Sequence, residues 1–237
     1  MSGFFSVMET ITHIPFALDT ETLMGRVHVE ADSDDARELE SLLERARTVA
    51  NPKAVYAECF IDAKADNTVT IGGIVFRSKT LRRNLDKAER VFAYVVTCGR
   101  ELDGIPVPQG DMLMEFWRDT IKAVLLSAAM QHVQDHLERR YRLSRTASMS
   151  PGSGDTDTWP IEQQAELFAL LGGVGEVRKQ SGVELTESFL MIPNKSVSGI
   201  RFPTEKDFRS CQVCHRTECP SRSAPFDKKL WEMIQHE

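Results

Sequence analysis

Residues 90–97 form the stretch RVFAYVVT. Its interior, VFAYVV at residues 91–96, is apolar throughout and rich in β-branched and aromatic side chains. Such a run predicts a strand that is buried rather than half exposed. The dipeptide Cys98-Gly99 follows directly and predicts that the chain turns there.

A long helix is expected after this strand, over residues 111–141. This segment has no Gly or Pro after Gly110, its middle is wholly apolar, and it ends in Glu138-Arg139-Arg140. Before the strand, leucines at helical spacing, Ser33 as a cap and Asn51-Pro52 as a stop predict a helix at 33–50. The other elements expected in the first half are strands at 54–61 and 69–76, the second broken by Gly72-Gly73, and a helix at 78–88.

The second half of the chain mixes helix and strand signals. Residues 148–159 are rich in Ser, Gly, Asp and Pro and predict a loop; a helix at 161–171, strands at 185–191 and 196–202, and a short final helix follow. This mixed order predicts an α+β fold: a mostly antiparallel twisted sheet with flanking helices, plus a C-terminal metal-binding loop. We divide the chain into an N-terminal extension (1–32), the main domain (33–202) and a cysteine-rich tail (203–237).

The charge and hydrophobic pattern of the chain argue against two classes of partner. The 237 residues carry a formal net charge of −6, and no basic run with interleaved aromatic residues occurs, so we expect no nucleic-acid partner. The apolar segment 123–130 is too short to cross a bilayer, so we expect no membrane partner. No N-terminal export signal is recognisable, which predicts a cytoplasmic protein.

The tail carries the most specific chemical signal, the run Cys211-x-x-Cys214-x-x-x-x-Cys219. Thiolates crowded into one loop favour a soft metal centre, either an iron–sulfur cluster or a zinc ion. Either centre takes four ligands, so we expect a fourth from Cys98, with His215, Cys59, a partner or a small molecule as other sources. A disulfide with a spare thiol, or a thiol-exchange pair, also uses cysteines at this spacing.

Two further motifs connect the chain to a known family. Trp159-Pro160-Ile161 opens the helix at 161–171, and residues 191–198 read Met-Ile-Pro-Asn-Lys-Ser-Val-Ser. Together with the Pro-Gly loop at 151–152, these motifs resemble the activation domain of cobalamin-dependent methionine synthase, most closely its free-standing bacterial form. The resemblance covers roughly residues 35–200, and a cysteine-rich tail also occurs in that form.

The resemblance implies a function. Domains of this family bind S-adenosylmethionine beside a cobalamin domain, so that cob(II)alamin is reduced by an electron donor and remethylated. We therefore expect an accessory protein, more an activation subunit than a free-standing enzyme. Its partners are a cobalamin-dependent methionine synthase or another corrinoid protein, which holds the cobalamin, and an electron donor; the tail cluster is an expected electron relay. The alternative is a non-enzymatic, degenerate homologue whose zinc tail recognises a partner.

The resemblance also places the ligand site. The family signature is Arg, three residues, then Gly-Tyr, and here Ser148, Gly152 and Ser153 occupy those positions. An Arg-to-Ser exchange removes a charge-assisted contact worth about 1.5–3 kcal/mol. Arg145 lies three residues before Ser148 and compensates only if the loop shifts in register. The expected cofactor-binding residues are Ser148, Pro151, Gly152 and Ser153, and no catalytic residue is assigned.

Overall fold

The computed structural model describes residues 7–154, 158–205, 208–216, 218–219 and 222–236. The helices are α1 (Thr20–Val27), α2 (Asp34–Val49), α3 (Lys79–Asn84), α4 (Met112–Tyr141), α5 (Gln164–Leu170), α6 (Val174–Ser181) and α7 (Lys228–His236). The strands are β1 (Glu9–Ile11), β2 (Lys53–Lys64), β3 (Thr68–Ile71), β4 (Ile74–Arg77), β5 (Arg90–Thr97), β6 (Thr146–Met149), β7 (Glu184–Leu185), β8 (Met191–Ile192) and β9 (Ser196–Pro203). Short 3₁₀ turns cover Glu101–Gly104, Ile161–Gln163 and Ser210–Val213.

The main sheet has seven strands, and its pairings are antiparallel. The strands follow the order β4-β3-β2-β5-β9-β6, with β1 paired to the first half of β2. Strand β5 lies between β2 and β9, and its residues from Val91 to Thr97 are buried. This arrangement confirms the buried strand expected from RVFAYVVT and the α+β fold class.

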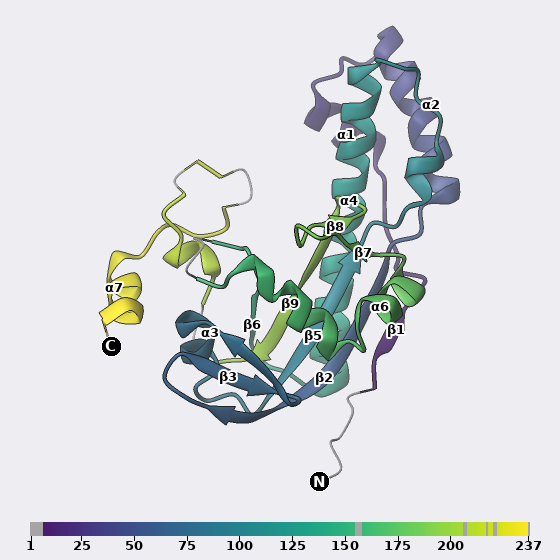
Figure 1. Ribbon diagram of the computed structural model, residues 1–237. Coiled ribbons are helices and arrows are strands. Elements are labelled where there is room, and N and C mark those ends of the chain that lie inside the picture. Colours follow the sequence, from purple (N-terminus) through teal and green to yellow (C-terminus); the bar gives the residue numbers. More distant parts are fainter. Residues whose placement is uncertain (1–6, 155–157, 206–207, 217, 220–221, 237) are drawn as a thin grey trace.

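The side chains of β5 alternate between the two faces of the sheet. Phe92 and Tyr94 join a cluster with Val133 and Leu137 of α4, the long helix that lies along one face (Figure 1). Val91, Ala93 and Val95 join the cluster on the opposite face, which α3, α5 and α6 cover. Because alternate strand residues point to opposite sides, a strand covered on both faces must be apolar at every position.

A third cluster lies beyond the end of the sheet. Helices α1 and α2 pack there on the first half of α4, around Leu39, Leu43, Trp117 and Ile121. Much of the segment 1–32, expected as an extension, takes part in the fold, since β1 pairs with β2 and α1 packs in this cluster.

Several element boundaries differ from the sequence-based expectation. The strand expected at 69–76 is a hairpin, because Gly72 and Gly73 adopt φ values of +55° and +80° and turn the chain between β3 and β4. Only the ends of the stretch 185–191 pair, as β7 and β8. Helix α6 was not predicted, and the loop expected from residue 148 begins inside strand β6. Within the described residues, no helix combines the length and apolarity that crossing a bilayer requires.

The N-caps of α2 and α3 offer a test of how the packing is stabilised. Ser33 caps α2 by accepting a hydrogen bond from Ala36 N at 3.0 Å. Ser78 caps α3 in the same way, from Leu81 N at 2.9 Å, but it is buried and also donates to the carbonyl oxygen of Thr158. We predict that Ser33→Ala lowers the free energy of unfolding by about 1 kcal/mol, and Ser78→Ala by about 2–3 kcal/mol because a buried carbonyl loses its donor. Urea unfolding measures both, and equal losses would contradict the role given to the Thr158 contact.

Candidate ligand pocket between the sheet and the tail

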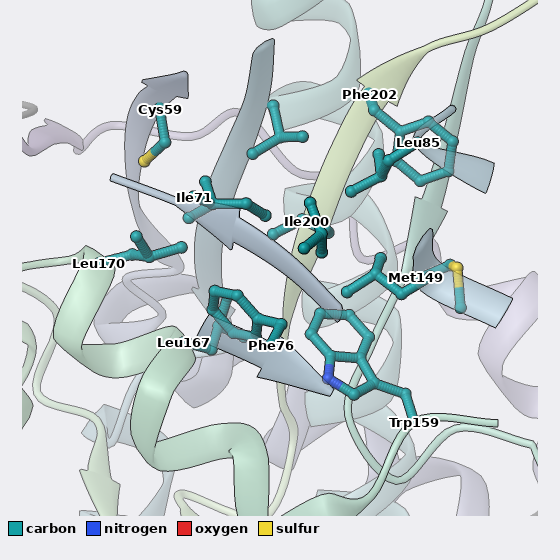
Figure 2. Close-up of a cluster of buried hydrophobic side chains, with 14 of the residues drawn as sticks. Cys59, Ile71, Phe76, Leu85, Met149, Trp159, Leu167, Leu170, Ile200 and Phe202 are labelled. Carbon is teal, nitrogen blue, oxygen red and sulfur yellow. The ribbon is translucent and has the colours of Figure 1, made fainter. Parts of the chain in front are cut away.

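Strands β6 and β9 turn one face to the apolar core and carry polar side chains on the other face. Met149 pairs with Ile200, and both side chains point into the cluster around Trp159, as Figure 2 shows. The preceding and following residues, Ser148 and Arg201, are also a cross-strand pair. Because the side-chain period of a strand is two residues, this pair points to the opposite face of the sheet.

A pocket of about 450 Å³ lies at this polar face. Three parts of the chain line it: the strands with α4, the loop after β6, and the tail. The lining residues are Gln134, Thr146, Ala147, Ser148, Ser150, Ser153, Arg201, Phe208, Arg209, Ser210, Cys211 and Ser223. The structure therefore brings two of the expected ligand-binding residues, Ser148 and Ser153, to the same pocket as Cys211, one of the expected metal ligands.

The loop after β6 owes its shape to Gly152. This residue has φ +73°, a conformation that side chains disfavour, and its N–H donates to the carbonyl oxygen of Trp159 at 2.8 Å. An added Cβ would lie 3.0 Å from side-chain atoms of Ile161. Pro151, Gly152 and Ser153 also line a second pocket of about 270 Å³, together with residues of α5, β8 and β9. The four expected binding residues thus belong to one strand end and loop that border two adjacent pockets.

Gly199 on β9 allows this loop to approach the sheet. A Cβ at this position would lie 2.5 Å from the carbonyl oxygen of Met149, 2.7 Å from Ser150 Oγ and 2.9 Å from the hydroxyl of Tyr94. Distances under 3 Å are not tolerated, so only glycine fits. Tyr94 is its cross-strand partner on β5, and burial raises the pKa of that phenol. The close approach of these atoms of β5, β6 and the loop to β9 therefore requires a residue without a side chain at position 199.

Arg201 is the functional candidate that the sequence analysis missed. Its side chain lines the pocket although the residue is only 7% exposed. Nη1 donates to the hydroxyl of Thr146 at 2.7 Å, and that hydroxyl donates to Glu138 Oε1 of α4 at 3.1 Å. The available signal was a charged residue in the otherwise apolar stretch GIRF at 199–202. Charged residues are rarely this buried without a role in pairing or binding.

The tail contributes Cys211 in an environment that favours its thiolate. The backbone N–H and the hydroxyl of Ser223 donate to Sγ at 3.4 and 3.5 Å, and these hydrogen bonds hold the pKa of Cys211 below its ordinary value. The guanidinium of Arg222 also donates to the carbonyl oxygens of Cys211 and Cys214, at 3.2 and 3.0 Å. These contacts tie the two ends of the cysteine loop together.

Cys98, the expected fourth metal ligand, lies elsewhere. It is buried in the cluster formed by α1, α2 and α4, and burial raises the pKa of its thiol to about 11. Cys59 is buried in the core beside β3, whereas Cys211, Cys214 and Cys219 are partly exposed. The described parts of the chain contain no group of three or more His, Cys, Asp or Glu side chains placed to hold a metal ion. The metal centre of the tail therefore stays a prediction.

Comparisons with known proteins concern the family and the fold. Residues 126–215 match the family model described as the vitamin B12 dependent methionine synthase activation domain. The fold is similar to a solved structure entitled "Crystal Structure of the MetH Reactivation Domain bound to AdoHcy", with a TM-score of 0.56 and 17% sequence identity over 88% of this chain and 82% of that one. No curated protein matches the chain. The resemblance drawn from the sequence motifs is confirmed, and the matched segment contains β6, the loop, β9 and Cys211.

The close approach at Gly199 leads to a prediction. A methyl group in Gly199→Ala meets the backbone of β6, so we expect a loss of about 1–3 kcal/mol or more of unfolding free energy. Gly25→Ala in α1 is the matched control, because its Cβ meets nothing within 4 Å, and there we expect a gain of about 0.5–1 kcal/mol from helix propensity. Thermal unfolding measures both; a neutral Gly199→Ala would show that β6 shifts freely.

The contrast between the cysteines leads to a second prediction. Iodoacetamide attacks thiolates, so we expect Cys211 to react at a pH below that of an ordinary thiol, while Cys98 stays protected in the folded protein. Ser223→Ala removes one donor to Sγ and should move the midpoint of Cys211 alkylation to higher pH. Peptide mapping by mass spectrometry over a pH series reads out each residue. An unchanged midpoint in Ser223→Ala would remove that hydroxyl as the cause.

Proposed function

Because residues 126–215 match the model of the vitamin B12 dependent methionine synthase activation domain, we propose that the chain serves reductive activation of a cobalamin-dependent methionine synthase or a related corrinoid protein. One observation carries this proposal: the loop at the family's ligand-binding position borders a polar pocket that also contains a buried guanidinium. The protein acts as an accessory subunit, and the cobalamin is held by its partner.

The proposed ligand is S-adenosylmethionine. The related reactivation domain is described as bound to AdoHcy, the compound that remains after S-adenosylmethionine has given up its methyl group. A sulfonium ligand carries a nucleoside, an ammonium group and a carboxylate, which together need many hydrogen-bonding partners. The pocket offers hydroxyls from Ser148, Ser150 and Ser153 and a guanidinium from Arg201. Its volume of about 450 Å³ lies in the range of pockets for small ligands.

When the ligand is bound, it supplies a methyl group for transfer to the reduced cobalt of the partner's cofactor. The residues of this chain bind and orient that ligand. The loop at 150–153 is held by the Gly152–Trp159 hydrogen bond, and β6 is held by its pairing with β9. The tail from Phe208 to Cys211 forms one wall of the pocket. Positioning on rigid strands is the contribution that a protein makes when a cofactor performs the chemistry.

The tail is proposed to hold an iron–sulfur cluster on Cys211, Cys214 and Cys219. Hydrogen bonds from Ser223 lower the pKa of Cys211 relative to an ordinary thiol, which suits ligation, since a metal binds the thiolate. Among the described residues these side chains form no preassembled ligand group, so binding a metal would require them to move together. Because Cys98 belongs to a different cluster, we propose His215 or an external group as the fourth ligand. A zinc ion in place of the cluster would leave a structural tail for partner recognition.

Calorimetric titration with S-adenosylmethionine tests the ligand. We expect binding by the wild-type protein and a loss of at least tenfold in Ser153→Leu, because Ser153 lines both pockets and the larger side chain fills them. Ser41→Leu on the exposed face of α2 is the matched control and should bind normally. A second readout is the recovery of oxidised methionine synthase, followed through loss of cob(II)alamin absorbance. Absent binding to both the wild type and the control would contradict the proposed ligand.

Metal analysis and an anaerobic absorption spectrum test the tail. A cluster absorbs broadly in the visible and bleaches on reduction, whereas zinc is colourless. Cys214→Ser should remove most of the bound metal, and Cys59→Ser, at a buried core cysteine, should not. Full metal content in Cys214→Ser, or none in the wild type, would contradict ligation by the tail.

A further inference from the structure

We propose that Arg201 binds the carboxylate of the sulfonium ligand, from the strand opposite the position where the family carries its arginine. The inference rests on the proposed function and concerns the chemistry by which this chain recognises its ligand. Ser148 occupies the family's arginine position, and Ser148 and Arg201 face each other across β6 and β9. The guanidinium is thus moved across one strand spacing rather than lost.

Cross-strand geometry makes the exchange workable. Directly opposite residues have Cβ atoms about 4.5–5.5 Å apart, a distance that one arginine side chain covers easily. Both residues line the same pocket. An arginine on β9 therefore reaches the volume that an arginine at position 148 on β6 would reach.

The surroundings of Arg201 leave its charge to be matched by a ligand. The residue is 7% exposed, and a buried charge is costly unless it is paired. Its Nη1 donates to Thr146, and Glu138 is reached only through that hydroxyl. Among the residues that the structure describes, no carboxylate forms an ion pair with it. A guanidinium has five N–H donors, so donors remain for a two-point contact with a carboxylate in the pocket.

The arginine nearest in sequence does not fill this role. Arg145 is exposed, and its Nη1 donates to the carbonyl oxygen of Glu205 at 2.9 Å. It is absent from the residues that line the pocket. This removes the compensation expected from a shift of the loop and makes Arg145→Gln a matched control that loses one guanidinium from the same region.

The first experiment needs no variant. The wild-type protein is titrated with S-adenosylmethionine and with its decarboxylated form, which keeps the sulfonium and the amine. A charge-assisted two-point contact predicts that loss of the carboxylate weakens binding about tenfold to a hundredfold. Arg201→Gln should bind both compounds with nearly equal affinity, and Arg145→Gln should keep the wild-type preference.

The second experiment moves the guanidinium back. In Ser148→Arg alone, two guanidinium groups face each other across the strands, which disfavours folding and binding. The double variant Ser148→Arg, Arg201→Ser keeps one guanidinium at the pocket and should recover the preference for the carboxylate. Circular dichroism and thermal unfolding show whether each variant is folded. If Arg201→Gln does not fold, the comparison of the two compounds on the wild-type protein still tests the proposal.

The outcomes separate the two proposals. If the wild type binds S-adenosylmethionine but does not distinguish its decarboxylated form, or if folded Arg201→Gln keeps the preference, the role of Arg201 is overturned while the proposed function stands. If the wild type binds neither compound, the proposed function fails and this inference fails with it. Preference in the wild type, loss in Arg201→Gln and recovery in the double variant together support the assignment.

Discussion

The pairing of β9 with its two neighbours is the constraint on which the other features of this molecule depend. At Gly199 the backbone of β6, the hydroxyl of Tyr94 and the side chain of Ser150 come so close that a single methyl group would not fit. In the register of this pairing, Met149 lies opposite Ile200 and Ser148 opposite Arg201. The register in turn decides which side chains of β6 enter the core and which enter the pocket, because a shift of one residue would reverse every side chain on the strand.

The two faces of β6 and β9 have different roles. On one face Met149 and Ile200 pack with Trp159 and supply the apolar burial that stabilises the sheet. On the other face Ser148 and Arg201 are free of that role and meet the ligand pocket. The buried face makes the strands rigid, and a rigid support is what holds polar groups in position for binding.

The tail places a thiol, that of Cys211, at the same pocket. Cys211 lines the pocket beside strand residues that lie far from it in sequence, and its hydrogen bonds favour the thiolate. Cys98 is buried among apolar side chains, where burial disfavours the thiolate. Cys211 and Cys98 thus differ in the direction of their thiol pKa shift because their surroundings differ.

Several local elements and the family resemblance can be read from the sequence. The apolar run at 90–97, the cap of α2 at Ser33 and the long helix α4 follow from patterns that neighbouring residues carry, and the motifs at 151–198 carry the family resemblance. What lies opposite Ser148 follows from the tertiary structure. Strand pairing joins residues 53 positions apart, so no local pattern reveals that Arg201 faces Ser148 in the pocket, that Cys211 borders the same pocket, or that Cys98 does not.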